Sequence, residues 1–112
     1  MDNHFHNNTA RIGGGADISG TTIVTNNEFL NNNGENYGGG LYIDSGDSKI
    51  IDNRFIDNSA LLDGGGLAIN AGGEATISGN IFNGNSVYLF PTEPDIGGGG
   101  LSILISDRDV IL

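Results

Sequence analysis

Four side chains in the sequence have the chemistry needed to hold a sugar: Asp17, Tyr42, Asp44 and Asn70. A tyrosine ring packs well against the apolar face of a sugar, and carboxylates and amides hydrogen-bond to its hydroxyl groups. The same residue types are common on strands that simply face solvent, and that alternative stays open. We predict a ligand-binding surface at these four residues and assign a catalytic role to none.

An enzyme that acts on carbohydrate is the alternative to a binding segment. Glycoside hydrolysis requires two carboxylates about 5–10 Å apart, one of them in surroundings that raise its pKa. Adjacent strands would bring Asp17 and Asp44 within that distance, but the residues around them are small and polar and would desolvate neither. A polysaccharide lyase would need several carboxylates around calcium and a nearby arginine. Arg54 instead shares a repeat position with Glu28, on the predicted strand that also carries Val24 and Ile50. An exposed ion pair of about 0.2–1 kcal/mol explains it there.

Metal-binding residues are few. His4 and His6 alternate on one predicted strand and face the same side, and two imidazoles can begin a metal site. No third ligand is evident, so we predict no metal site and no cofactor. The acidity would allow calcium to stabilise the chain, although no calcium motif supports it. Residues 107–109, with the sequence Asp-Arg-Asp, predict a local salt bridge in a turn.

The charge of the chain excludes several classes of partner. Asp and Glu number 14 against 4 Lys and Arg, a net charge of -10, whereas binding to nucleic acid or anionic membranes depends on clustered Lys and Arg. Cysteine is absent, so disulfides and thiolate chemistry are excluded. The apolar runs are too short to span a bilayer, and the polar residues 1–4 do not predict a signal peptide.

The elements that must position these side chains come from an internal repeat. A phenylalanine followed three residues later by an asparagine occurs four times, at steps of 24, 26 and 27 residues. These pairs are Phe5/Asn8, Phe29/Asn32, Phe55/Asn58 and Phe82/Asn85. A triple glycine begins at Gly13, Gly38, Gly64 and Gly98, at steps of 25, 26 and 34. The residues from Tyr88 to Ile96 in the long step, with two prolines, predict an inserted loop.

Aligning the repeats produces columns of similar side chains. The strand after the glycines has two apolar columns, which are Ala16/Leu41/Leu67/Leu101 and Ile18/Ile43/Ile69/Ile103. A second strand carries Val24, Ile50 and Ile77, and Asn3, Asn27, Asn53 and Asn80 align three residues later. Stacked coils would bring each column together at about 4.8 Å, where rings stack and amides hydrogen-bond from coil to coil.

The repeat therefore predicts an all-β fold, a right-handed, single-stranded parallel β-helix or β-solenoid. It would have about four coils of 24–27 residues, one of them with the inserted loop. Residues 1–112 would form a single segment. Neither end resembles a polar cap, so we expect part of a longer solenoid, or end-to-end self-association through uncapped coils.

The columns resemble those of the polymorphic outer membrane proteins, whose passenger domains are right-handed β-helices. The matching segments are residues 29–32, 55–58 and 82–85 for the Phe-x-x-Asn motif, and 39–42 and 65–68 for the glycine motif. The third glycine stands where that family usually has alanine. More loosely, the chain is similar to the pectate-lyase-like superfamily. The resemblance implies a secreted or cell-surface location, an autotransporter passenger and adhesion to glycans or host-surface molecules.

The sequence thus predicts a non-catalytic structural or adhesive segment of a secreted or surface β-helix. A polysaccharide lyase or glycoside hydrolase acting on the exposed face after the glycine corners is the alternative. No nucleic-acid partner and no membrane span are expected.

Overall fold

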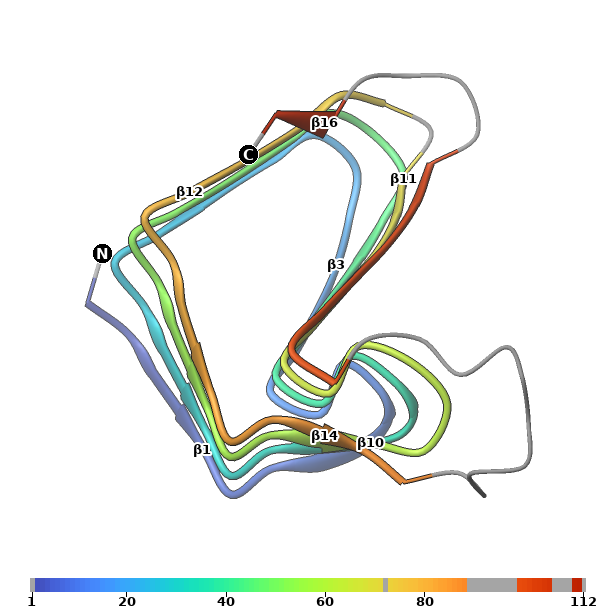
Figure 1. Ribbon diagram of the computed structural model, residues 1–112. Coiled ribbons are helices and arrows are strands. Elements are labelled where there is room, and N and C mark those ends of the chain that lie inside the picture. The colour runs from blue at the N-terminus through green and yellow to red at the C-terminus, as the bar shows by residue number, and fades with distance from the viewer. Residues whose placement is uncertain (1, 72, 89–98, 106–109, 112) are drawn as a thin grey trace.

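The computed structural model describes residues 2–71, 73–88, 99–105 and 110–111, which form sixteen strands and no helix. The strands make four sheets, and all pairings within them are parallel. Viewed along the stack, each coil lies on the one before it (Figure 1). The predicted parallel β-solenoid is confirmed. No helix in the described part of the chain is long and apolar enough to cross a membrane.

Each coil contributes one strand to every sheet. The first sheet holds β1 (His4–His6), β5 (Glu28–Leu30), β9 (Arg54–Ile56) and β13 (Ile81–Asn83). The second holds β2 (Thr9–Ile12), β6 (Asn33–Tyr37), β10 (Ser59–Ala60) and β14 (Ser86–Val87). The third holds β3 (Ala16–Ser19), β7 (Leu41–Asp44), β11 (Leu67–Ala71) and β15 (Leu101–Ile105). The fourth holds β4 (Thr22–Thr25), β8 (Ser48–Ile51), β12 (Ala75–Ser78) and β16 (Val110–Ile111).

The structure corrects one detail of the predicted coil. Glu28 and Arg54 were assigned to the strand that carries Val24 and Ile50, but they lie in β5 and β9, in a different sheet. A corner separates the two sheets, because Asn26 and Asp52 each have a φ of 56°. Asn and Asp adopt this left-handed conformation more readily than other residues with a side chain. Of the predicted inserted loop, all but Tyr88 lies outside the described residues, as does the turn at 107–109.

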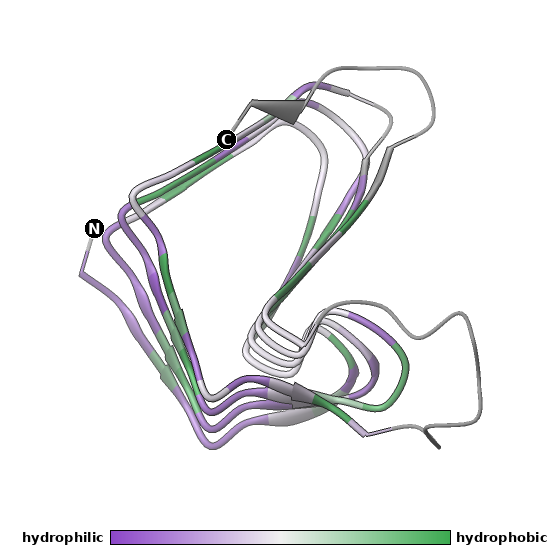
Figure 2. Ribbon diagram, viewed as in Figure 1, coloured by the Kyte–Doolittle hydropathy of each residue, from purple (hydrophilic) through white to green (hydrophobic). Residues whose placement is uncertain are grey.

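The interior contains the predicted apolar columns. The rings of Phe5, Phe29, Phe55 and Phe82 stack with centroids 4.8–4.9 Å apart and planes 4–7° from parallel. Leu41, Ile43, Ile50, Leu67 and Ile69 are buried around them. Figure 2 shows these apolar positions recurring at the same place in successive coils. A single coil could not bury them, so the core exists only through stacking.

Two ladders of buried asparagine follow the corners on either side of the first sheet. In one, the backbone N–H and the Nδ2 of Asn32 both donate to Asn58 Oδ1, at 2.9 and 3.0 Å. Asn58 in turn donates from the same two nitrogens to Asn85 Oδ1, at 3.0 and 3.0 Å. Asn27, Asn53 and Asn80 form the second ladder in the same way.

Each inner asparagine contacts three coils. Besides its bonds to the next coil, Asn58 Nδ2 donates to the carbonyl oxygen of Phe29 in the preceding coil at 2.8 Å. Asn53 Nδ2 donates to the carbonyl oxygen of Val24 at 2.8 Å. Both amide side chains are 0% exposed and bonded at oxygen and nitrogen, which offsets the cost of burying them.

The triple glycines form the corner between the second and third sheets. Gly38 has a φ of 59°, in the left-handed region. A Cβ on Gly39 would collide with the carbonyl oxygens of Ser59 and Gly65, so backbone of the next coil occupies the space a side chain would need. This close approach explains why the corner keeps glycine in each repeat.

We expect Asn58→Asp to lower the free energy of unfolding by about 3 kcal/mol. The change removes both Nδ2 hydrogen bonds and places a carboxylate against the carbonyl oxygen of Phe29 and against Asn85 Oδ1. Asn83→Asp makes the same change at an exposed side chain and should cost no more than about 0.5 kcal/mol. Urea unfolding followed by circular dichroism measures both, and equal losses would contradict a structural role for the ladder.

Candidate functional site

The outer face of the third sheet carries the four residues predicted to bind a ligand. The register aligns Asp17 with Tyr42 in one outward-facing column. In the next outward-facing column, two residues later along the strand, it aligns Asp44 with Asn70. These residues alternate with the buried columns and therefore point outward. Asp17, Asp44 and Asn70 are exposed, whereas Tyr42 is half-buried.

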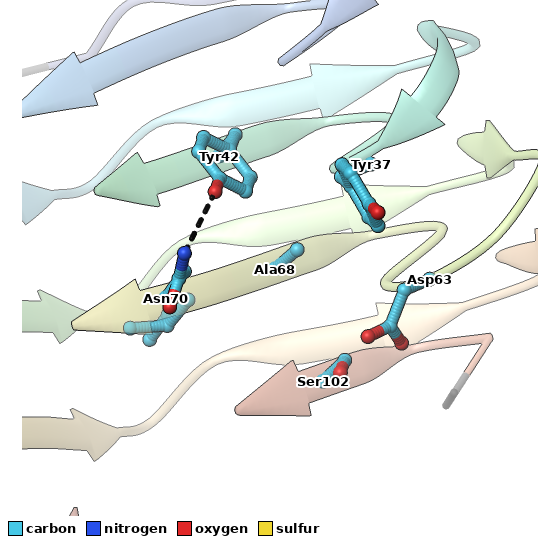
Figure 3. Close-up of a pocket in the computed structure, with 7 residues that line it drawn as sticks. Tyr37, Tyr42, Asp63, Ala68, Asn70 and Ser102 are labelled. Carbon is cyan, nitrogen blue, oxygen red and sulfur yellow. Dashed lines mark hydrogen bonds between the residues drawn. The ribbon is translucent and has the colours of Figure 1, made fainter. Parts of the chain in front are cut away.

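A cleft of about 160 Å³ lies over part of this face (Figure 3). It is lined by Tyr37, Tyr42, Asp63, Ala68, Ile69, Asn70 and Ser102. Two of the four predicted residues, Tyr42 and Asn70, are therefore brought together, while Asp17 and Asp44 are not part of the lining. The volume is below the roughly 300–1,000 Å³ of pockets that enclose drug-sized ligands. It suits one ring-sized group of a larger molecule.

The recess results from the sizes of successive side chains in one column. Tyr42 pairs with Ala68, which pairs with Ser102. The two small residues that follow the tyrosine leave the space open beside its ring. Figure 3 shows Tyr42 and Asn70 on one side of Ala68, and Tyr37 and Asp63 on the other.

The second aromatic wall is Tyr37, which the sequence reasoning missed. It ends β6, and the glycine corner at Gly38 turns the chain so that Tyr42, five residues later, lies beside it. The ring centroids are 6.2 Å apart, and the planes are inclined at 33°. Tyr37 is 37% exposed, so its ring remains available to a ligand. Its position directly before the glycine run was a signal in the sequence, but it aligns with Ile12 and Asp63 rather than with other aromatics.

The polar side chains of the cleft are the amide of Asn70, the carboxylate of Asp63 and three hydroxyls, those of Tyr37, Tyr42 and Ser102. Asn70 Nδ2 donates to Tyr42 Oη at 3.4 Å, an exposed and long hydrogen bond that a ligand could replace at little cost. Asp63 was also missed, and its Oδ1 is buried without a hydrogen-bond partner among the described residues. An unpaired buried acceptor is costly to the stability of the fold.

The charges around the cleft favour a neutral ligand. Among the described residues, no lysine or arginine lines the cleft, and Asp63 carries the one charged group of the lining. An anionic ligand would therefore meet like charge without a counter-charge. Two aromatic rings and hydrogen-bonding groups on a rigid sheet can bind a polyhydroxyl compound, with the rings against its apolar face.

The comparisons with known proteins concern the fold. The family model described as right-handed beta helix region matches residues 1–111, nearly the whole chain. Neither a curated protein nor a solved structure matches the chain significantly.

We expect Asp63→Asn to raise the free energy of unfolding by about 1 kcal/mol relative to Asp44→Asn. Both changes remove one negative charge, but Asp63 is half-buried with an unpaired oxygen, whereas Asp44 is exposed. A neutral amide costs less to desolvate than a carboxylate. Thermal or urea unfolding of the two variants measures the difference. A lower stability of Asp63→Asn than of Asp44→Asn would show that the carboxylate has a structural partner.

Proposed function

Because the chain belongs to the family of right-handed β-helix regions, we propose that it is a non-catalytic adhesive segment of a secreted or cell-surface protein. The segment binds neutral carbohydrate at the cleft on the third sheet. The observation that carries this proposal is the pair of tyrosine rings, Tyr37 and Tyr42, with centroids 6.2 Å apart beside an open recess.

The form of the cleft supports a polymeric or branched ligand. A volume of about 160 Å³ holds a single ring, and the site lies on an outer face rather than in an enclosed cavity. A chain of sugars can place one residue between the tyrosines while its neighbours extend over the sheet. The sheet is rigid because its inner columns are packed, so little ordering cost is added on binding.

The described part of the lining holds a single acid, which favours binding over hydrolysis. Glycosidases place two carboxylates on opposite sides of the scissile bond. Of the acids that the structure describes, Asp63 alone lines the cleft, while Asp17 and Asp44 are exposed and lie outside it. A surface location is supported by the resemblance of the repeat to polymorphic outer membrane protein passengers, in which a β-helix stalk displays adhesive faces.

Affinity electrophoresis against a panel of neutral polysaccharides tests the proposal. We expect retardation of the wild type by at least one of them, and Tyr37→Ala and Tyr42→Ala to weaken that binding about tenfold, through loss of ring stacking. Tyr42→Phe keeps the ring and should bind nearly as well as the wild type. Tyr88→Ala removes an exposed tyrosine outside the lining and is the matched control.

Two results would overturn the proposal. If Tyr88→Ala reduced binding as much as Tyr42→Ala does, the ligand would bind outside the cleft. If the wild type bound none of the neutral polysaccharides, the proposed ligand class would be wrong. Release of reducing or unsaturated ends from any polymer would show catalysis, which the proposal denies.

A further inference from the structure

The outer face of the first sheet carries a second cluster, unrelated to the tyrosine cleft. We propose that His4, His6 and Glu28 bind a divalent transition-metal cation of the Zn²⁺ type. Two imidazoles and one carboxylate form a donor set that zinc uses in proteins, with water completing the coordination. The two histidines are evident as ligands in the sequence, and the coil register supplies Glu28 as the third.

The core determines the register that brings the three side chains together. β1 and β5 pair with His4 directly beside Glu28, and in the same register Phe5 stacks on Phe29 with centroids 4.8 Å apart. Since Phe5 points inward, His4 and His6 on either side of it both point outward. At the start of the same strands, Asn3 Nδ2 donates to Asn27 Oδ1 at 3.0 Å and ties the two coils together.

The distances are close to those of a metal site. Glu28 Oε1 lies 2.9 Å from His6 Nε2 and 3.4 Å from His4 Nδ1. One ligand atom from each of the three residues lies within 4.8 Å of the others. In a tetrahedral zinc site with bonds of about 2.0–2.2 Å, neighbouring ligand atoms lie about 3.3 Å apart. Modest rotation of the two imidazoles therefore suffices to form the site.

The side chains are accessible and free to make that adjustment. The exposed fraction of the side chain is 64% for His4, 38% for His6 and 25% for Glu28. The imidazole planes stand 74° apart, and both rings present a nitrogen to the same carboxylate oxygen. In the tautomers with hydrogen on those nitrogens, both rings donate hydrogen bonds to Glu28. To bind a cation through the same nitrogens, each neutral ring carries its proton on its other nitrogen.

Charged side chains surround the cluster. Arg54 Nε lies 3.7 Å from the other oxygen, Glu28 Oε2, and leaves Oε1 to the imidazoles. Asp2 and Asp52 line a surface hollow together with His4, Glu28 and Arg54, so negative charge also lies near Arg54.

The choice of metal follows from the donor atoms. Imidazole nitrogen suits zinc, copper and nickel, whereas calcium prefers an all-oxygen shell. Calcium at the same concentration is therefore expected not to compete with zinc for this cluster.

Isothermal titration calorimetry of the untagged chain with zinc chloride tests the site. We expect one equivalent to bind, and Glu28→Gln and His6→Gln each to weaken binding about tenfold or more. Glu35→Gln removes an exposed carboxylate elsewhere in the second sheet and should bind zinc like the wild type. In the wild type, zinc should shift the ¹⁵N resonances of His4 Nδ1 and His6 Nε2, a readout that needs no variant.

Three results would overturn the site. The wild type could fail to bind zinc, or Glu28→Gln and His6→Gln could bind zinc as tightly as the wild type. The third such result is that zinc leaves the imidazole resonances unshifted. Competition by calcium would also overturn it, because the ligands would then be carboxylates alone. None of these results bears on the tyrosine cleft, which lies on a different sheet.

Discussion

The buried asparagine ladders are the interaction on which the stacking of the coils depends. A parallel strand pairs with any neighbour of similar pattern, so backbone hydrogen bonds alone do not determine the register. Asn53 and Asn58 do so, because each is bonded at once to the coil before it and the coil after it. A slip by one residue would leave several buried amide groups without partners, each costing about 1–3 kcal/mol. The phenylalanine stack beside the ladder gains its parallel geometry from the same register.

Since the inner columns repeat and determine the register, the outer columns are free to vary. Both candidate sites use this freedom. At the cleft, one outer column runs from Tyr42 through Ala68, and the change in size produces the recess. At the metal cluster, the outer neighbours of the phenylalanine column are two histidines in one coil and Glu28 in the next. The two candidate sites are thus formed by outer positions that differ between coils, and the repeated inner positions hold the coils in register.

Much of the fold could be predicted because repetition reveals which positions face inward. The phenylalanine, asparagine and aliphatic columns are correct, since burial allows few alternatives at those places. The corners were harder to predict, because Asn26 and Asp52 turn the chain through left-handed φ values that polar residues also adopt in loops. The sites depend on outer positions without a repeat. Tyr37 reaches Tyr42 across a corner, and His6 reaches Glu28 diagonally, so both contacts depend on side-chain orientation that alignment of columns does not provide.

Hydrogen exchange of the backbone amides tests the role of the ladders most directly. The amides of Asn27, Asn32, Asn53 and Asn58 each donate to the side-chain oxygen of the next asparagine in the stack. If the ladders hold the coils together, these four amides exchange with the slowest group in the chain, at the rate of global unfolding. Exchange of these amides well before the strand amides of the core would contradict the account, because the coils would then stay stacked with the ladders open.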